Sequence, residues 1–230
     1  MTEFRSFGPE LAAFLKDLHS NNERGWFTAN RDRYEETVRE PARAFIRAMA
    51  PALAAISPHF RADDRKTGGS LMRIHRDTRF SRDKTPYKTN VGIQFRHALG
   101  RDVHAPGFYV HLEPGSAFLG AGAWRPDSSA LFMIRARIDE EPDTWREVRD
   151  DEAFRAAFRL GGESLKTMPR GFARDHALAE DLRRKDFIAL HELPIGDALG
   201  PEFPDLATAR MRDSAGFMRF LCEALDVPFR

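Results

Sequence analysis

The sequence contains a single cysteine, Cys222, in a chain of 230 residues. One cysteine cannot form an internal disulfide, and it cannot build a cysteine-based metal cluster. Because Cys222 follows Phe220 and Leu221 in the apolar phase of an expected C-terminal helix, we expect a buried, inert thiol. The cysteine content therefore excludes a disulfide scaffold, and a reducing cytoplasm is the expected location.

Long apolar segments are also missing. The longest apolar stretch, residues 42–56, is interrupted by Arg43, Arg47 and Pro51. A membrane-spanning helix needs about 20 consecutive apolar residues, so this stretch is not a candidate. The first residues, MTEFRSFGPE, lack the basic segment and apolar run of a secretory leader. We therefore expect no leader and no membrane partner.

The chain has no overall excess of charge, since 36 Lys and Arg residues face 35 Asp and Glu residues, for a net charge of +1. Proteins that bind nucleic acid usually carry a basic excess over the whole chain or one face. The balance argues against general nucleic-acid binding. The hydrophobic share of 42% and the 19 Phe residues are typical of a folded globular protein with a sizeable core.

The spacing of apolar residues predicts helices at both ends of the chain and strands between them. Helical spacing covers residues 9–18, 30–39, 41–56, 126–138, 142–160, 178–185 and 206–225. Alternation of apolar and polar residues predicts strands at 71–76, 91–96, 108–113 and 117–123, and a short one at 187–190, while 194–204 is expected to be a connector. We predict an α+β fold, with an antiparallel sheet of about four to six strands and N- and C-terminal helices packed on one face.

No repeat, low-complexity tract or linker divides the chain, so we expect a single domain over residues 1–230. Its helical N-terminal part should cover about 1–60, its sheet about 70–123 and its helical C-terminal part about 126–230.

The stretch from residue 73 to residue 88 is the densest cluster of charge. Its cations are Arg73, Arg76, Arg79, Arg82, Lys84 and Lys88. Only Asp77 and Asp83 oppose them, so the local balance is +6 − 2 = +4. Arginine forks, hydroxyls and lysines in one loop suit a phosphate or carboxylate group. We predict that the loop contributes these ligand-binding residues: Arg73, Arg76, Arg79, Ser81, Lys84, Tyr87 and Lys88.

The alternative for this loop is a surface hairpin in which exposed Arg–Asp pairs only order the chain. A Walker phosphate loop is excluded, because the G-x-x-x-x-G-K-[ST] pattern is absent.

Three polar residues, Tyr109, His111 and Glu113, alternate with apolar ones on one expected strand. Their side chains should repeat at roughly 6–7 Å along one face, which Arg73 and His75 would also line. In an enzyme, His111 would act as a general base oriented by Glu113, and Tyr109 would donate to a developing oxyanion. These are the candidate catalytic residues, and the alternative is a solvated sheet face with ordinary cross-strand pairs.

A metal site is a weaker hypothesis. His75, His111 and Glu113 have the composition of a two-histidine, one-carboxylate triad, and His104 is a further candidate. The spacing H-x6-H-x-E is not a recognised ligand spacing, so we assign no metal. The sequence names no cofactor.

Several long motifs resemble one family. R-x-x-R-D-T-R-F-S-x-D-K-T-P-Y-K-T over residues 73–89, then APGFYVHLEPG, GAGAWRPD and LKTMPRGF, are similar to the bacterial and fungal family labelled domain of unknown function 2461. The resemblance covers nearly the whole chain. His75 departs from the residues common in that family, which argues against an essential role for it. The resemblance implies a single domain and no known activity.

Together these features predict a small anionic ligand, phosphorylated or carboxylated, bound in a basic pocket, and they leave catalysis open. The alternative is a non-enzymatic module that binds nucleic acid or a protein through the same loop, where bases interleave with Phe80 and Tyr87. A concave site favours the first hypothesis, and a flat or convex basic surface favours the second.

Overall fold

The computed structural model describes residues 3–100 and 106–230 of the chain. Its strands form one antiparallel sheet in the order β1-β2-β3-β5-β4. Their bounds are β1 Val91–Arg96, β2 Gly107–Glu113, β3 Ser116–Ala123, β4 Arg159–Gly161 and β5 Phe187–Pro194. The predicted α+β class is confirmed.

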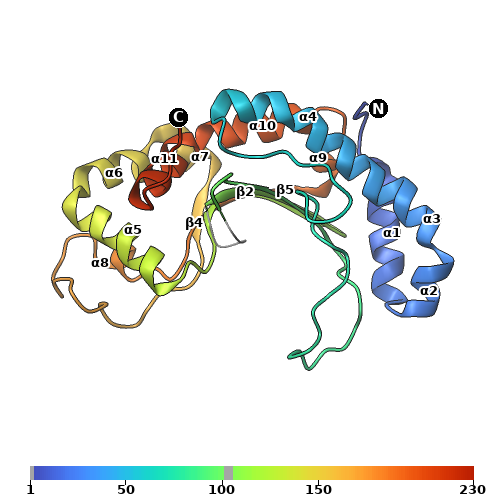
Figure 1. Cartoon of the computed structure of the whole chain (residues 1–230), viewed down its shortest axis with the longest axis horizontal. Helices are drawn as coiled ribbons and strands as arrows, with labels where there is room; N and C mark the ends of the chain where they lie inside the picture. The colour runs from blue at the N-terminus through green and yellow to red at the C-terminus, as the bar shows by residue number, and fades with distance from the viewer. Residues whose placement is uncertain (1–2, 101–105) are drawn as a thin grey trace.

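The helices come from both ends of the chain. Those before the sheet are α1 Gly8–Ser20, α2 Arg24–Ala29, α3 Arg31–Tyr34, the π-helical turn η1 Glu35–Arg39 and α4 Glu40–Ile56. Those after β3 are α5 Ser128–Glu140, α6 Pro142–Asp150, α7 Glu152–Ala157, α8 Ala179–Leu182, α9 Ile195–Leu199, α10 Phe203–Asp213 and α11 Ala215–Ala224. Figure 1 shows an arch in which α4, α9 and α10 lie over one face of the sheet. The other face of the sheet lines the inside of the arch.

Alternation along the strands explains the two faces. In β2, Phe108, Val110 and Leu112 are completely buried beneath the helices, whereas Tyr109 and His111 between them are only partly buried. The same alternation runs through β1, where Ile93 is buried between the concave positions 92 and 94. One side of each strand therefore belongs to the core, and the other side forms the concave face.

The core has two hydrophobic clusters. One joins α1–α4 to β1 and β2, and the other joins α5–α8, with Trp145 of α6 at its centre, to Phe187 of β5. Helix α11 contributes Cys222 to the first cluster and Phe217 to the second. Burial raises the pKa of the Cys222 thiol to about 12, as an inert thiol requires. The shared sheet and α11 connect the clusters, and the single domain stays a prediction.

Four local predictions were wrong. Residues 71–76 form no strand and make only the isolated bridges Leu71↔Ile93 and His75↔Tyr87. Residues 159–161 form β4 instead of ending a helix, because they pair with β5. The expected connector at 194–204 contains α9, and the last helix is interrupted at Ser214. Strand pairing decided the first two cases, because residues 71–76 make only isolated bridges and residues 159–161 pair with β5.

Within the described ranges, 3–100 and 106–230, no helix has both the length and the apolar content needed to cross a bilayer.

Candidate functional site on the concave face

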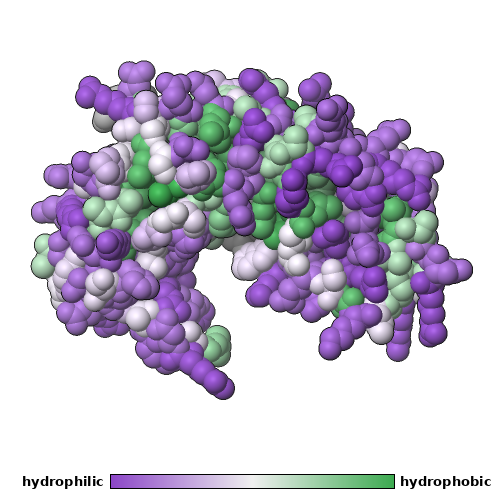
Figure 2. All heavy atoms as spheres, turned by 180° about the vertical axis from the view of Figure 1, so that it is seen from behind, coloured by the Kyte–Doolittle hydropathy of each residue, from purple (hydrophilic) through white to green (hydrophobic). Residues whose placement is uncertain are grey.

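The register of the sheet brings the predicted polar residues to one place. Tyr109 pairs with Gln94 on one side and Gly120 on the other, and His111 pairs with Gly92 and Phe118. Figure 2 shows the hollow beneath the arch from behind, bordered mainly by hydrophilic side chains. The middle of the sheet therefore offers a polar and aromatic surface inside a hollow.

Glycine makes room for the Tyr109 ring. A Cβ added at Gly92 would lie 2.6 Å from the Tyr109 Oη and 3.0 Å from the Met72 Sδ. A Cβ added at Gly120 would lie 3.5 Å from the Tyr109 Cβ, which is ordinary contact. The tyrosine hydroxyl therefore lies over Gly92, and a side chain at position 92 would displace it.

Tyr109, His111, Glu113 and Ser116 form one polar chain, which we call the Tyr109 chain. Tyr109 Oη lies 3.2 Å from His111 Nδ1. His111 Nε2 faces a Glu113 oxygen at 3.5 Å, and Ser116 Oγ donates to the other Glu113 oxygen at 2.7 Å. The imidazole stacks on Phe118 with 4.6 Å between ring centroids. The structure thus brings the three candidate catalytic residues together.

Burial sets the protonation of the chain. It lowers the pKa of His111, and the Glu113 carboxylate opposes this only partly. It raises the pKa of Tyr109 to about 12, and Glu113 adds to the rise. The hydrogen bond from Ser116 lowers the pKa of Glu113. Near neutral pH the chain therefore holds a phenol, a neutral imidazole and a carboxylate.

These protonation states determine which atom donates in each hydrogen bond of the chain. With Glu113 facing Nε2, that nitrogen carries the imidazole proton, and His111 Nδ1 accepts from the Tyr109 hydroxyl. The Asn90 amide also reaches Nδ1, at 3.5 Å. The chain can accept a proton from a ligand hydroxyl at Tyr109 Oη while the Tyr109 proton moves to His111 Nδ1.

The root of the 73–88 loop, by which we mean residues 73–75 and 87–88, is anchored in the core. Tyr87 is 6% exposed and stacks on Phe27 with 4.2 Å between ring centroids. The Asn22 side chain donates to the Tyr87 carbonyl at 2.9 Å and accepts from its backbone N–H at 3.0 Å. Tyr87, predicted to contact ligand, therefore lies where it holds the loop in place. We had expected His75 on the concave face, but its ring lies near Phe27 and Tyr87 instead.

Two cations at this root, Arg73 and Lys88, have no carboxylate of their own. Within residues 3–100 and 106–230, neither side chain makes a hydrogen bond or an ion pair. Burial lowers the pKa of the half-buried Lys88, and the positive charge of Arg73 lowers it further. Asp77 is the carboxylate that Arg73 influences, but Asp77 is paired with Arg79 at 2.7 Å. Positive charge at the root is therefore uncompensated.

Most cations at the tip of the loop, residues 76–85, already make ion pairs or hydrogen bonds within the tip. Arg76 pairs with Asp83 and also bonds the Thr85 hydroxyl. Lys84 Nζ donates to the Thr78 carbonyl at 2.9 Å. The carboxyls of Asp77 and Asp83 have their pKa lowered to about 2, chiefly by the arginines Arg79 and Arg76 that they bind.

Ser81, also predicted to bind ligand, lies in the tip, where its backbone N–H donates to the Thr78 carbonyl at 3.3 Å. The neighbouring Phe80 is 95% exposed. Tip and root therefore offer different surfaces, although both belong to one basic loop.

The metal hypothesis gains nothing from the geometry. In the described parts of the chain, no three His, Cys, Asp or Glu residues lie together as a metal site would require. His75 packs near Phe27 and His111 lies on β2. His104 lies outside the described residues.

Sequence reasoning missed two contributors to the site. Asn90 contacts His111, and Phe118 supplies the ring on which His111 stacks. A signal for Asn90 was present, since Lys88, Asn90 and Gly92 continue the concave phase of β1 backwards along the chain. Predicting the contact of Phe118 with His111 would have required the register of β2 against β3, which depends on the tight turn between the two strands.

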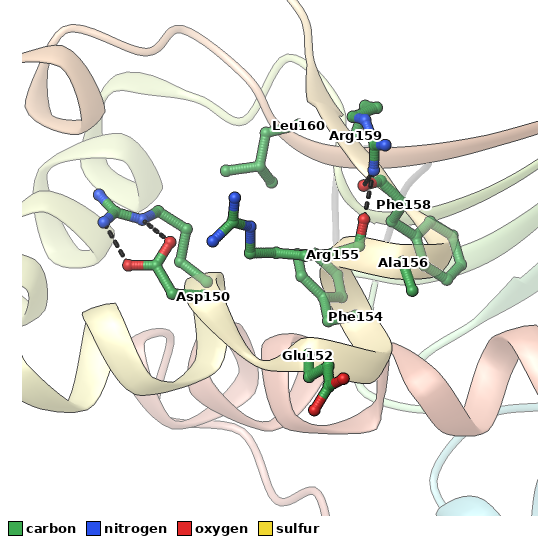
Figure 3. A pocket seen from close by; sticks show the side chains of 9 residues that line it. Asp150, Glu152, Phe154, Arg155, Ala156, Phe158, Arg159 and Leu160 are labelled. Carbon is green, nitrogen blue, oxygen red and sulfur yellow. Dashed lines mark hydrogen bonds and ion pairs between the residues drawn. The ribbon is translucent and has the colours of Figure 1, made fainter.

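A cavity of about 560 Å³ lies at the other edge of the sheet, between α6, α7 and β4. Figure 3 shows the Arg155 side chain reaching into it between Asp150 and Leu160. Arg149 is paired with Asp150 at 2.5 Å, and Arg159 donates to a backbone carbonyl at 2.8 Å. No lining residue belongs to the Tyr109 chain or to the loop, so this cavity does not form part of the candidate site.

The fold and the site define a class of protein, namely an α+β protein with an open antiparallel sheet and a polar chain on its concave face. A family model described as conserved hypothetical protein (DUF2461) matches residues 10–220, and the chain belongs to this family. A comparison with curated proteins gave no significant match. The matched range includes all five strands and the 73–88 loop, and its description names no activity.

Proposed function

We propose that the protein binds a small phosphorylated or carboxylated ligand on the concave face. Arg73 and Lys88 hold the anionic group, and the Tyr109 chain contacts the rest of the ligand. The observation that carries this proposal is the pair of cations at the loop root, which lack a carboxylate partner among the described residues. Asn90 links the two parts, because it follows Lys88 by two residues and reaches His111.

Electrostatics supports an anion at this root. Two neighbouring positive charges repel, and the repulsion grows where burial lowers the effective dielectric. Burial and Arg73 together lower the Lys88 pKa, and the negative charge of a bound anion would offset this and raise that pKa. The anchoring of Tyr87 by Asn22 fixes the backbone beside Lys88 before any ligand arrives, which reduces the entropy lost on binding.

The Tyr109 chain supports proton transfer from the ligand as the accompanying chemistry. A ligand hydroxyl gives its proton to Tyr109 Oη while the Tyr109 proton moves to His111 Nδ1, and Glu113 stabilises the imidazolium that forms. Phe118 keeps the imidazole plane fixed during this exchange. A ligand with an oxygen near its anionic group suits this arrangement.

The test compares cations of one loop. A thermal-shift screen of phosphorylated and carboxylated metabolites is run on the native chain, on Arg73→Gln and on Lys88→Gln. Arg82→Gln is the matched control, because it removes the same charge from the exposed tip of the same loop. We expect at least one ligand that stabilises the native chain and the control but neither root variant. Stabilisation that survives both root substitutions contradicts the proposal.

A second candidate function uses the tip. Phe80 is 95% exposed, and the Arg79 guanidinium lies 5.8 Å from its ring centroid. An exposed ring among cations is how proteins hold a base of a single strand beside its phosphates. Binding of a labelled oligothymidylate that weakens steeply with salt and is lost in Phe80→Ala would support this function. Binding that is insensitive to both would exclude it.

A further inference from the structure

A small cavity with a basic lining lies beside Arg96, at the end of β1 that is distant from Lys88. Its volume is about 120 Å³, and its walls are segment 61–70 and the end of β1. One water occupies about 30 Å³ of the liquid, so the cavity corresponds to roughly four waters. Such a space has room for one tetrahedral oxyanion.

The lining of this cavity is positively charged. Arg61, Arg65 and Arg96 contribute three positive charges and Asp63 one negative charge, which gives +3 − 1 = +2. Arg65 Nε donates to the two Asp63 oxygens at 3.0 and 2.8 Å. That interaction lowers the pKa of Asp63. Arg65 and Asp63 neutralise each other, so the surplus belongs to Arg61 and Arg96.

Arg61 and Arg96 are neighbours on adjoining segments. The backbone N–H of Arg61 donates to the Arg96 carbonyl at 3.0 Å, and both residues line the cavity. Over residues 3–100 and 106–230, neither guanidinium has a hydrogen-bond or ion-pair partner. Arg96 is also partly buried. Two arginines beside one small space, without a partner in the described parts of the chain, are a suitable host for a tetrahedral anion.

His97 also lines the cavity, but its ring nitrogens are already used. Nε2 lies 2.7 Å from the Pro228 carbonyl, and Nδ1 accepts from the Leu99 backbone N–H at 3.2 Å. Burial lowers the pKa of His97, so the ring is neutral near pH 7. The charge available to a ligand is that of the two arginines.

The wall formed by segment 61–70 is fixed without a ligand. Ser70 Oγ donates to the Arg61 carbonyl at 3.1 Å and accepts from the Asp63 N–H at 3.0 Å. A Cβ at Gly69 would lie 2.5 Å from the Asp63 carbonyl oxygen, so only glycine allows this close approach. The cavity is therefore formed in advance, which lowers the cost of binding.

We propose that this cavity binds one oxyanion of the phosphate or sulfate type, held by Arg61 and Arg96. The site is separate from the loop root, because the extended chain from residue 88 to residue 96 covers roughly 26 Å at about 3.3 Å per residue. The proposal therefore does not depend on the ligand proposed for Arg73 and Lys88.

Titration with inorganic phosphate tests it, using the native chain, Arg61→Gln and Arg96→Gln. Arg212→Gln is the matched control, because Arg212 is an exposed arginine on α10, outside the cavity. The amide signals of Gly68 and Gly69, which line the cavity, report binding there by NMR, separately from binding at the loop root. We expect saturable shifts at these glycines, with affinity reduced tenfold or more in each cavity variant and unchanged in Arg212→Gln and Lys88→Gln.

Absence of saturable shifts in the native chain overturns the proposal, as does an equal loss in Arg212→Gln. Because Arg61 is exposed, Arg61→Gln keeps the test valid even where Arg96→Gln alters folding. Phenyl phosphate then distinguishes two sources of the anion. Binding of both probes assigns the cavity to the phosphate of a larger molecule, binding of inorganic phosphate alone assigns it to a free ion, and binding of neither overturns the proposal.

Discussion

The root and the tip of the 73–88 loop contain similar residues in opposite surroundings. At the root, Tyr87 is 6% exposed, whereas at the tip Phe80 is 95% exposed. The root cation Lys88 has no carboxylate partner among the described residues, whereas the tip cations Arg76 and Arg79 are paired with Asp83 and Asp77. The comparison teaches that a local charge surplus does not show which cations are available to a ligand. Ion pairs within the tip engage two of its four cations, whereas neither cation of the root is engaged in an ion pair among the described residues.

The largest expected effect is a difference in stability between variants of two aromatic residues of the loop, Tyr87 at the root and Phe80 at the tip. Tyr87→Ala removes a buried ring that stacks on Phe27 and should destabilise the protein by about 3 kcal/mol, in the range for large core truncations. Phe80→Ala removes an exposed ring and should change stability by no more than about 0.5 kcal/mol. Urea denaturation of both variants measures the difference. Equal destabilisation would contradict the distinction between an anchored root and a free tip.

The next effect concerns the anchor itself. Asn22→Ala removes both hydrogen bonds to the Tyr87 backbone and should cost about 1–3 kcal/mol. Amide exchange should accelerate at residues 76 and 88, whose N–H groups close the root of the loop. Asn21→Ala is the control, because that exposed side chain bonds only the end of α1. Unchanged exchange in Asn22→Ala would show that the loop is held by other contacts.

The pH dependence of stability should come from the Tyr109 chain and His97 and not from the tip. Burial lowers the folded-state pKa of His111 and of His97 below the ordinary 6.5. The unfolded chain then binds more protons, so stability falls as pH decreases through about 6.5. Asp77 and Asp83, lowered from 3.8 to about 2, contribute stability above 3.8 that is lost only as pH falls through about 2.

Urea denaturation between about pH 7.5 and pH 5.5 measures this dependence. His111→Gln should flatten the slope, since it removes one of the two groups that resist protonation. A slope that is unchanged in His111→Gln would show that the imidazole is not constrained as the concave face suggests.

The smallest expected effect belongs to the ion pairs of the tip. Asp83→Asn breaks the pair with Arg76, but Asp83 is 57% exposed. Exposed ion pairs contribute little, since solvent already screens them. The unfolding midpoint should not change measurably, and scanning calorimetry can check this. A clear loss of stability would mean that the tip is structurally coupled to the root.

Much of the fold could be predicted from the sequence where the patterns are long. Alternation in residues 108–113 assigned Phe108 and Tyr109 to opposite faces, and the structure confirms it. The three-residue β4 was missed because its only support is pairing with β5, far away in the chain. Residues 71–76 alternate in the same way, yet the chain leaves the sheet after Leu71 and Met72 bond to β1.

The candidate site was predictable in part. The Tyr109–His111–Glu113 spacing placed three side chains on one face, because strand periodicity is local. The separation of root from tip was not predictable, since it depends on Asn22, between α1 and α2, and on Phe27 of α2, which contact Tyr87 across a long sequence separation. Counting charges in the sequence also treated Arg76 and Lys88 as equally available to a ligand. The ion pair between Arg76 and Asp83 is seen only in the folded loop.

A crystal structure of the protein with the ligand recovered from the metabolite screen tests the central claim most directly. The account predicts that the anionic group lies within hydrogen-bond distance of Lys88 Nζ and the Arg73 guanidinium, with an oxygen of the ligand facing the Tyr109 hydroxyl. An anion held between Arg79 and Arg82 at the tip, with nothing bound on the concave face, would contradict it.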